Sequence, residues 1–411
     1  MVLPGMRVVI LADQFAPALG GALGVCYQHA VGLSRRGHQV TVLTANGQPT
    51  AGVAVNVVTA PFHPRWGAYL GLHHPSAVRQ VAAALRRLKP DIVHAHNIYQ
   101  ALSYRCLEAA RRSAPKVFLT THDVQSFAYA KLTHFIDPAR RDCPFRPKYR
   151  TSWLVNLRTA KKRFNPFRNA VIRRRLNGIT KVLAVSQALA DALADNGITN
   201  VAVVHNGIDL TPWTPRPPAV TEELLRRFDL VGRRVLLFPG RISGAKGINQ
   251  ILAALAAAAQ TVPDAALLVA GSAEGGGSSY QQLPQGYGVA ERVRFAGQLS
   301  PEEMVAAYFA CAAVVVPSVC FDSFPSVNLE AMAAGKPVVA TCFGGSREAV
   351  ADGQTGFIIN PYDTNALTDR IVRLLSDPAL AARLGVAGHA RAVAEFSAPR
   401  WLEELERQYA A

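Results

Sequence analysis

Long apolar segments are missing from this sequence, which argues against a membrane-spanning helix. The longest apolar runs, Met304–Pro317, Ile251–Ala259 and Ala265–Ala270, stop short of the roughly 20 residues needed to cross a bilayer. Residues 1–12 lack the positively charged start and the small-residue cleavage site of a signal peptide. We therefore expect a cytoplasmic protein whose first buried strand is Arg7–Leu11.

Cysteine is scarce as well. The six cysteines stand singly along the chain, at Cys26, Cys106, Cys143, Cys311, Cys320 and Cys342. No two of them have the spacing of metal ligands, and a disulfide framework would be unusual in a 411-residue chain with so few. The pattern favours a reducing cytoplasm, with most of the cysteines in the core.

Acidic residues are few: 28 Asp and Glu face 44 Lys and Arg, which leaves a formal net charge of +16. Between Lys131 and Lys181 there are 15 basic residues and only two acids, Asp137 and Asp142. A concentrated basic stretch implies an anionic partner. Because aromatic residues lie among the basic ones in 127–176, we expect this segment to dock on an anionic membrane at the inner face of the cell membrane.

Two other interpretations of residues 127–176 stay open. A solvated loop and helix pair would simply keep the protein soluble, and a polyanionic glycan or nucleic acid would also bind the basic groups. The sequence has no recognisable zinc, RNP or helix-turn-helix signal, so we expect no nucleic-acid partner.

Short apolar, β-branched runs alternate with helical stretches such as Gly24–Arg36 and Gln250–Ala259 along the whole chain. The runs show little polar alternation, which is typical of parallel strands buried on both faces. The candidate strands are Arg7–Leu11, Gln39–Thr44, Asp91–Ala95, Lys116–Thr120, Lys181–Val185 and Val201–Val204, then Arg234–Phe238, Ala266–Ala270, Arg292–Phe295, Ala313–Val316, Pro337–Ala340 and Phe357–Ile359. The pattern predicts an α/β fold twice over.

The length suits two domains of about 150–200 residues each. A change of domain is expected within Thr211–Val220, which packs four prolines into ten residues. We predict two Rossmann-like domains facing across a cleft, residues 1–212 and 213–395. In such sheets ligands bind beyond the carboxyl ends of the strands, so the loops that follow each strand are the places to search.

The segment Pro317–Val339 is the most informative stretch. A strand ends at its start, a loop carries Asp322, and a helix opens near Ser326. We expect Ser326 to cap this helix, whose first N–H groups would attract phosphate. Asp322 and Glu330 would then be two carboxylates beside an anion site, placed to hold hydroxyl groups. An ordinary capped surface helix is the alternative.

These residues resemble the donor-site signature of the family 4 retaining glycosyltransferases (glycosyltransferase group 1), which have the GT-B fold. The signature is an acid, seven residues, Glu330, the letters A-M-A-x-G-K-P-V-V, and then G-G-x-x-E. Further segments resembling the family in the same order are Pro17 with Gly20 and Gly21, Gly37–Val40, Val204–Asp209, and Phe238–Arg241 with Lys246 and Gly247. The resemblance covers nearly the whole chain except about 127–176.

The resemblance implies roles for four charged residues. Arg241 and Lys246 would neutralise the donor diphosphate, Glu330 would accept hydrogen bonds from the ribose, and Asp322 would hold hydroxyl groups of the donor sugar. The family usually has Glu at the position of Asp322, so the donor sugar is expected to sit differently here or to be a different sugar. The other implied donor-binding residues of this part are Gly240, Phe324, Pro325 and Ser326.

The first domain is expected to contribute as well. Gly20 and Gly21 would let the backbone approach the donor, since glycine has no Cβ, and Asn206 belongs to the segment that resembles the family's hinge. By resemblance, His122 would lie close to the donor sugar and share in catalysis; a core histidine is the alternative.

His94 and His96 form an H-x-H pair on a strand, but no third metal ligand is apparent in the sequence, so we expect acceptor contact or packing instead. The last amphipathic segment, Phe396–Tyr409, would pack back on the first domain, as such helices often do in GT-B enzymes.

The resemblance predicts an enzyme that transfers a sugar from a nucleotide diphosphate sugar, most commonly a UDP-sugar, with retention and without a metal or other cofactor. Its acceptor is expected to be a lipid-linked or glycan intermediate of cell-surface polysaccharide synthesis. A sugar-nucleotide epimerase or hydrolase of the same fold and a non-catalytic nucleotide-sugar-binding protein are the alternatives.

Overall fold

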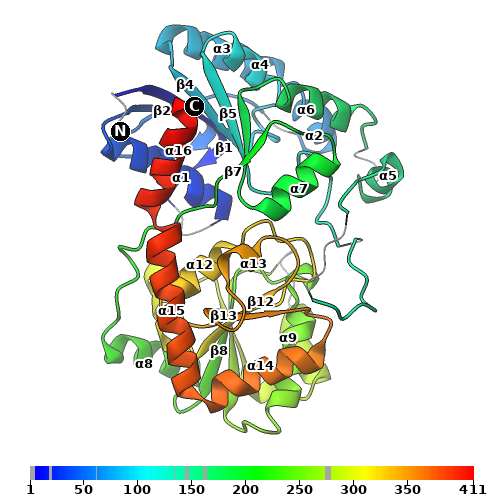
Figure 1. Cartoon of the computed structure of the whole chain (residues 1–411), viewed down its shortest axis with the longest axis vertical. Coiled ribbons are helices and arrows are strands. Elements are labelled where there is room, and N and C mark those ends of the chain that lie inside the picture. The colour runs from blue at the N-terminus through cyan, green and yellow to red at the C-terminus, as the bar shows by residue number, and fades with distance from the viewer. Residues whose placement is uncertain are drawn as a thin grey trace. The chain divides into compact units, whose positions relative to one another are not determined.

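The computed structural model describes residues 5–17, 21–61, 63–133, 135–143, 148–160, 164–273 and 279–411. They form two compact units (Figure 1). The N-terminal unit comprises Met1–Leu132, Lys148–Gly207 and Ala398–Ala411, and the C-terminal unit comprises Thr133–Pro147 and Ile208–Ser397. The chain therefore changes unit after Gly207, not at the expected position 212. The basic stretch is divided between the units, whereas the sequence placed it wholly in the first.

The N-terminal unit is built on a parallel sheet with the strand order β3-β2-β1-β4-β5-β6-β7 among the described residues. Its strands are β1 (Arg7–Phe15), β2 (Gln39–Gly47), β3 (Ala54–Val57), β4 (Ile92–His96), β5 (Lys116–Thr121), β6 (Lys181–Ala184) and β7 (Val201–Val203). Its helices are α1 (Gly21–Arg35), α2 (Gly67–Leu70), α3 (Pro75–Leu88), α4 (Cys106–Arg111), α5 (Trp153–Ala160), α6 (Arg168–Leu176), α7 (Gln187–Asp195) and α16 (Ala398–Ala410).

The C-terminal unit has a parallel sheet with the order β10-β9-β8-β11-β12-β13. Its strands are β8 (Arg234–Pro239), β9 (Ala265–Ala270), β10 (Val293–Gly297), β11 (Ala313–Val316), β12 (Val338–Thr341) and β13 (Gly356–Ile359). Its helices are α8 (Pro218–Arg227), α9 (Ile248–Ala258), α10 (Ser279–Gly286), α11 (Pro301–Ala310), α12 (Ser326–Ala333), α13 (Ser346–Ala349), α14 (Thr364–Ser376) and α15 (Pro378–Phe396).

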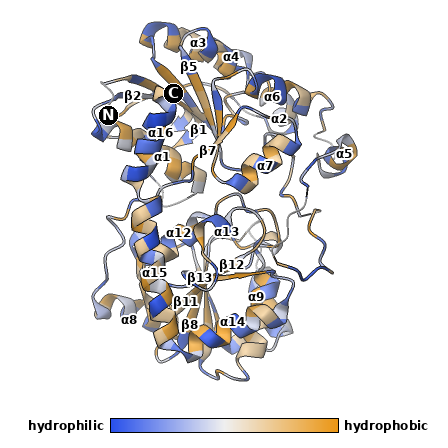
Figure 2. Ribbon diagram, in the orientation of Figure 1, coloured by the Kyte–Doolittle hydropathy of each residue, from blue (hydrophilic) through white to orange (hydrophobic). Residues whose placement is uncertain are grey.

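Burial explains why the central strands could be found from the sequence. Every residue of β4, β9, β11 and β12 is buried, and Figure 2 shows the strands of both sheets as predominantly hydrophobic. The strand β3 was missed because it lies at a sheet edge, where none of its four residues is buried. An edge strand does not need the apolar run that marks a buried parallel strand.

The C-terminal helix α16 packs against α1 within the N-terminal unit. Trp401, Leu402, Leu405 and Tyr409 join the core of that unit. Gly32 of α1 permits this close approach, because a Cβ at that position would clash with the Leu402 side chain. No helix among the described residues is long and apolar enough to cross a membrane.

The strand order reverses direction at one point in each sheet. In the N-terminal unit, β1 to β3 follow one another toward one edge of the sheet, and β4 to β7 follow one another toward the other edge. In the C-terminal unit, β8 to β10 and β11 to β13 do the same, so the reversal lies between β8 and β11. Loops that leave adjacent strands in opposite directions open a crevice at the carboxyl ends of those strands, and ligands bind there. The fold therefore points to one candidate half-site in each unit.

Candidate functional site

The half-site of the C-terminal unit begins with the loop that follows β8. Gly240 and Arg241 come directly after the strand, and a short helical turn then places Lys246 before α9. Gly247 ends the turn with φ +83°, and a Cβ at that position would overlap the carbonyl oxygen of Pro317 at the end of β11. Only glycine lets the two loops of the switch point approach this closely.

Lys246 and Asp322 meet at this point. The Lys246 Nζ donates to Asp322 Oδ2, and Ser318 Oγ donates to the same oxygen at 3.0 Å. Burial alone would lower the pKa of Lys246, but the adjacent Asp322 carboxylate outweighs it and the pKa is raised. Lys246 is therefore fully protonated at neutral pH.

The loop that carries Asp322 is held by its backbone. Asp322 forms a parallel bridge with Gly344, and the Gly345 N–H donates to the Asp322 carbonyl at 2.9 Å. Gly344 has φ +84°, and a Cβ there would overlap the Asp322 backbone. The two glycines of the segment G-G-x-x-E thus have a structural role, because they fix the backbone of the loop that carries the Asp322 carboxylate.

Two helix N-termini follow the strands of this switch point. The N-cap of α9 is Gly247, which has no side chain to bond the first N–H groups, and α12 begins after Pro325 without a side-chain cap. The exposed Arg241 has no acidic partner among the described residues. Uncapped N–H groups beside Arg241 and Lys246 form an arrangement suited to a phosphate or diphosphate group.

The expectation that Ser326 caps α12 was wrong. The N-cap is Pro325, Ser326 is the first helical residue, and its side chain hydrogen-bonds the Glu330 carboxylate one turn later. Glu330 Oε2 also accepts from the Tyr308 hydroxyl at 2.7 Å. Burial raises the pKa of Glu330, while these two hydrogen bonds oppose the rise. Glu330 is thus a buried carboxylate with partners in its own unit.

Three other residues of this segment are buried. Phe324 packs on Phe396 with ring centroids 5.9 Å apart, and Pro325 is buried beside it, so both serve the core as well as the loop. Sequence reasoning passed over Asn328, which is fully buried and whose amide nitrogen and oxygen find no partner among the described residues. A buried amide without partners is rare and calls for a ligand or water. Its position inside the S-V-N-L-E segment was the available signal.

The half-site of the N-terminal unit is a hollow of about 150 Å³ at the switch point between β1 and β4. It is lined by Ala12, Asp13, Gln14, Ala22, Leu23, Cys26, His96, Asn97, Tyr99 and Gln100. Asp13 accepts from the backbone N–H of Gln100 at 2.8 Å and of Leu102 at 2.7 Å. Burial raises the pKa of Asp13 to about 6, with these N–H groups opposing the rise.

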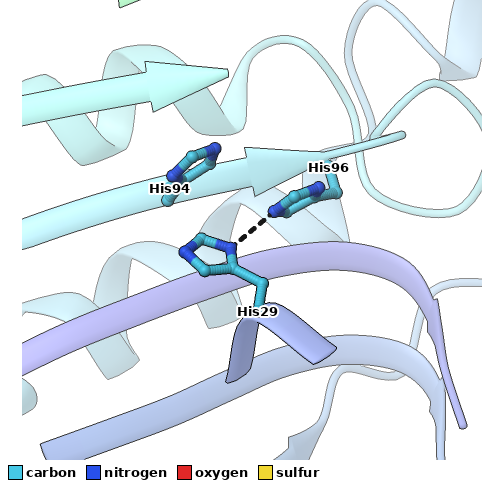
Figure 3. Close-up of side chains that lie close together, drawn as sticks. All are labelled: His29, His94 and His96. Atoms are coloured by element: carbon cyan, nitrogen blue, oxygen red, sulfur yellow. Dashed lines mark hydrogen bonds between the residues drawn. The ribbon is translucent and has the colours of Figure 1, made fainter. Parts of the chain in front are cut away.

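Beside this hollow, four histidines form a group, of which three are buried and His122 is half-buried. His29 on α1 lies against His94 and His96 on β4, as Figure 3 shows, and His29 Nδ1 is 2.8 Å from His96 Nε2. His96 Nδ1 is in turn 2.9 Å from His122 Nε2, just beyond β5. The sequence offered no third partner for the H-x-H pair, and the structure supplies one in His29. The next residue, Asp123, accepts from the Tyr99 hydroxyl at 2.7 Å.

The sequence also predicted Gly20, Gly21 and Asn206 as donor-binding residues of the N-terminal unit. Gly21 opens α1 with φ +64°, and Gly20 lies outside the described residues. Asn206 is buried, and its side-chain oxygen has no partner among the described residues. The structure thus brings together Lys246 with Asp322 in one unit and His96 with His122 in the other. It places Glu330 with Tyr308.

Comparison with known families gives two matches that together span most of the chain. The family described as "Glycosyl transferases group 1" matches residues 221–391, and "Glycosyltransferase Family 4" matches residues 19–212. The alpha-maltose-1-phosphate synthase of Mycolicibacterium smegmatis is 30% identical over 422 residues, covering 95% of this chain and 96% of the relative.

Solved structures with similar architecture cover the same extent. The sucrose-phosphate synthase of Thermosynechococcus elongatus superimposes with a TM-score of 0.75 at 22% identity, covering 98% of both chains. The Anabaena protein HepE, solved in complex with UDP, gives a TM-score of 0.72 at 22% identity, covering 98% of this chain and 100% of that one. At these identities the likeness concerns the fold.

Proposed function

This chain belongs to the glycosyltransferase group 1 family and has the GT-B fold of two parallel-sheet α/β domains, and from that premise we propose that it transfers a sugar from a UDP-sugar to an acceptor with retention of configuration. The observation that carries the proposal is the switch point of the C-terminal unit. There Lys246, Arg241 and two uncapped helix starts surround the place where a diphosphate would bind.

The choice of UDP follows from a protein of similar fold. The similar Anabaena protein was solved with UDP, and it shares the fold of this chain at 22% identity. UDP is accordingly the first nucleotide to test, with GDP and ADP as the comparisons.

The proposed reaction places the cations on the leaving group. The bond between the sugar C1 and the diphosphate oxygen breaks, and the acceptor hydroxyl oxygen bonds to C1 on the same face. The hydroxyl proton passes to the departing phosphate oxygen. Negative charge grows on the diphosphate as the bond breaks, so Lys246 and Arg241 stabilise the transition state more than the ground state. The cations do the work that a metal ion performs elsewhere, and we propose that no metal is required.

The ion pair places Lys246 and Asp322 side by side, where each can contact a different part of a bound nucleotide sugar. A donor diphosphate would offer Lys246 a second anionic partner, and Asp322 would then be available to accept hydrogen bonds from hydroxyl groups of the sugar. Asp322→Glu is expected to leave the protein folded and to change the preference among donor sugars. Equal selectivity of the two forms in a competition assay would contradict the role of Asp322.

A thermal-shift screen of nucleotides tests the donor assignment. A ligand that binds only the native state raises its stability by about 2.7 kcal/mol at a concentration of 100 times Kd. We expect UDP and UDP-sugars to raise the melting temperature in the presence of EDTA, and GDP and ADP to have less effect. A shift that appears only with Mg²⁺ or Mn²⁺ would contradict the metal-independent mechanism.

Glu330→Gln is expected to weaken donor binding by about 1–3 kcal/mol, because a neutral amide replaces a buried carboxylate that we propose accepts from the ribose. Folding should survive, since the amide oxygen can still accept from Tyr308. Isothermal titration with UDP measures the change. Tyr308→Phe is the matched control: it removes the hydrogen bond and lowers the stability without removing the carboxylate. Unchanged UDP affinity in Glu330→Gln would remove Glu330 from the donor site.

Two other activities are separated by product analysis. A hydrolase or epimerase would convert the nucleotide sugar without an acceptor, and a non-catalytic binding protein would bind it without any turnover. Mass analysis of the products with and without acceptor distinguishes all three. We expect release of UDP to depend on the acceptor.

The acceptor is proposed to be a lipid-linked or glycan intermediate of polysaccharide synthesis. The helix α5 of the N-terminal unit supports contact with an anionic membrane, because its large apolar side chains Trp153, Leu154 and Leu157 are exposed. It buries Asn156 and the small Ala160, and exposes Trp153 (66%) and Leu154 (48%). The exposed Arg150 and Arg158 flank these apolar side chains. Aromatic side chains beside basic ones suit the headgroup region of an anionic leaflet.

The substitutions Trp153→Ser and Leu154→Ser together are expected to reduce co-sedimentation with phosphatidylglycerol vesicles. Val386→Ser with Val393→Ser is the matched control, since these exposed apolar residues lie on α15 of the other unit. Binding should require anionic lipid and weaken with salt. No binding to anionic vesicles at low salt would end the membrane proposal. Replacing Arg175 would be a poor test, because it is held by Glu108 at 2.8 Å and by the Leu72 carbonyl at 2.7 Å.

A further inference from the structure

One continuous chain of hydrogen bonds joins four histidines of the N-terminal unit, His29, His94, His96 and His122. It runs from Thr120 through His94, Tyr409, His29 and His96 to His122, and joins β5, β4, α16 and α1. Its successive distances are 2.7, 2.6, 2.8, 2.8 and 2.9 Å. At its end, His122 Nδ1 is buried and has no partner among the described residues.

The histidines of this hydrogen-bond chain are neutral. Burial lowers the pKa of His29 to about 3 and of His122 to about 4, and it lowers those of His94 and His96 well below the ordinary value. A neutral imidazole has one N–H and one lone pair. Each ring must therefore donate on one side and accept on the other.

Tyr409 decides the direction of the chain, because its hydroxyl has one proton and lies between two ring nitrogens. If it donates to His29 Nε2, then His29 donates to His96, His96 donates to His122, and His122 carries its own proton on Nδ1. If Tyr409 donates to His94 instead, every bond reverses and His122 Nδ1 becomes a bare lone pair. Intermediate arrangements leave a buried proton without an acceptor, which is costly.

The two directions differ at Thr120. In the first, Thr120 Oγ1 donates to His94 Nε2; in the second it must accept, and its own proton has no other acceptor among the described residues. The first direction satisfies every proton except that of His122 Nδ1. A ligand oxygen at this nitrogen would complete the chain.

We propose that Tyr409, His29 and His96 are positioning residues that hold His122 as an Nδ1–H donor, so that the ligand atom it meets is a hydrogen-bond acceptor, such as a sugar or phosphate oxygen. That a ligand oxygen accepts from His122 rests on the proposed transferase function. The tautomer of His122 does not depend on that function. His122 in this state is not a general base.

Metal binding is the competing explanation of the three clustered histidines. Two nitrogens bound to one tetrahedral zinc ion at about 2.0–2.1 Å lie about 3.3 Å apart. His29 Nδ1 and His96 Nε2 are closer, at 2.8 Å, which is a hydrogen-bond distance. All six nitrogens of His29, His94 and His96 already have partners in the chain.

Nitrogen NMR of histidine-labelled protein tests the proposal, because the two ring nitrogens report the tautomer directly. We expect His122 to carry its proton on Nδ1 in the wild type and to become a mixture of tautomers in Tyr409→Phe, with a loss of kcat/KM. Trp401→Phe is the control: Trp401 packs on the His29 ring at 5.8 Å but makes none of these hydrogen bonds, so it should leave the tautomer unchanged.

Three results would overturn the proposal: Nε2–H on His122 in the wild type, an unchanged tautomer in Tyr409→Phe, or loss of the N–H signals on adding zinc. A tautomer that changes as expected while kcat/KM stays constant would keep the hydrogen-bond chain and remove His122 from the transferase site. The tautomer thus tests the hydrogen-bond chain, and kcat/KM separately tests the role of His122 in the proposed function.

A second feature of the N-terminal unit carries an independent inference. A hollow of about 530 Å³ lies between α4 and α6. It is lined by Arg105, Glu108, Arg111, Arg112, Val171, Arg174 and Arg175. Glu108 binds Arg175 at 2.8 Å and Arg105 at 3.2 Å, while Arg111, Arg112 and Arg174 form no ion pair within the part of the chain that the structure describes. The arginines outnumber the one carboxylate, and their mutual repulsion favours a bound anion.

The geometry points to a site for a ligand with two or more adjacent phosphate groups. Arg175 is already fixed by Glu108 and by the Leu72 carbonyl, so one guanidinium is preorganised. Arg111 and Arg174 lie at the carboxyl ends of their helices, shortly before β5 and β6 begin. The hollow is therefore removed from the carboxyl ends of the strands, where the histidine group lies.

Titration calorimetry with tripolyphosphate and with inorganic phosphate tests this site. We expect tripolyphosphate to bind more tightly, and Arg111→Gln with Arg174→Gln to lose about tenfold or more in affinity. The control is Arg79→Gln with Arg87→Gln on the exposed side of α3, which removes the same charge elsewhere. Equal loss in both variants, or no binding at low salt, would overturn the proposal. Phosphatidylglycerol vesicles in place of tripolyphosphate distinguish a lipid headgroup from a soluble phosphate.

Discussion

Lys246→Ala is expected to lower kcat by about 30-fold or more while changing the donor KM far less. A unit charge pair about 4 Å apart is worth roughly 4 kcal/mol at an effective dielectric near 20. If half of that develops only as the diphosphate departs, the barrier rises by about 2 kcal/mol, which is about 30-fold in rate. Steady-state kinetics with a UDP-sugar and its acceptor measure both constants.

The matched control for Lys246→Ala is Arg233→Ala. Arg233 is an exposed cation of the same unit, directly before the amino end of β8, and its removal changes the net charge equally. We expect it to leave kcat unaltered. A rise in KM with constant kcat in Lys246→Ala would mean that Lys246 only binds the donor. A cycle of Lys246→Ala, Asp322→Asn and the double variant separates the loss of the Lys246 charge from the effect of leaving Asp322 without its cation.

The N-terminal unit is expected to lose at least about 3 kcal/mol of stability between pH 7.5 and pH 5. His29 and His122 have folded pKa values of about 3 and 4, below the ordinary 6.5, so the unfolded chain takes up their protons first as the pH falls. Their stabilisation is present above pH 6.5 and is lost below it, about 2 kcal/mol for each by pH 5.

Asp13 acts in the opposite direction. Its folded pKa of about 6 lies above the ordinary 3.8, so the folded state takes up its proton first and gains about 1 kcal/mol by pH 5. His94 and His96, whose pKa values are also lowered, add to the loss. Hydrogen exchange of β4 at the two pH values, corrected for the intrinsic rate, measures the change. Protection of β4 that does not depend on pH would contradict it.

The central strands could be predicted from the sequence because a parallel strand buried on both faces must be an apolar run. The start of β1 at Arg7, for example, and the whole of β11 were placed correctly. The cap of α12 was misplaced by one position, because Pro325 and Ser326 can both begin a helix and sequence patterns locate such ends poorly.

The histidine group could not be predicted in the same way. His29 and Tyr409 are 380 positions apart, and no spacing rule relates residues that meet only through the packing of α16 on α1. The pairing of Lys246 with Asp322 was missed for the same reason: each residue was recognised in its own motif, but their contact depends on two neighbouring strands of the sheet.

The position of α16 has a consequence for the order in which the protein is made. Its side chains complete the core of the N-terminal unit, yet the ribosome synthesises them after the whole C-terminal unit. Until α16 is made, the face of α1 that it covers stays exposed and His29 lacks the hydroxyl group of Tyr409. The C-terminal unit can already fold during that time. Nascent chains stalled before α16 should accordingly protect β11 from proteolysis earlier than β4.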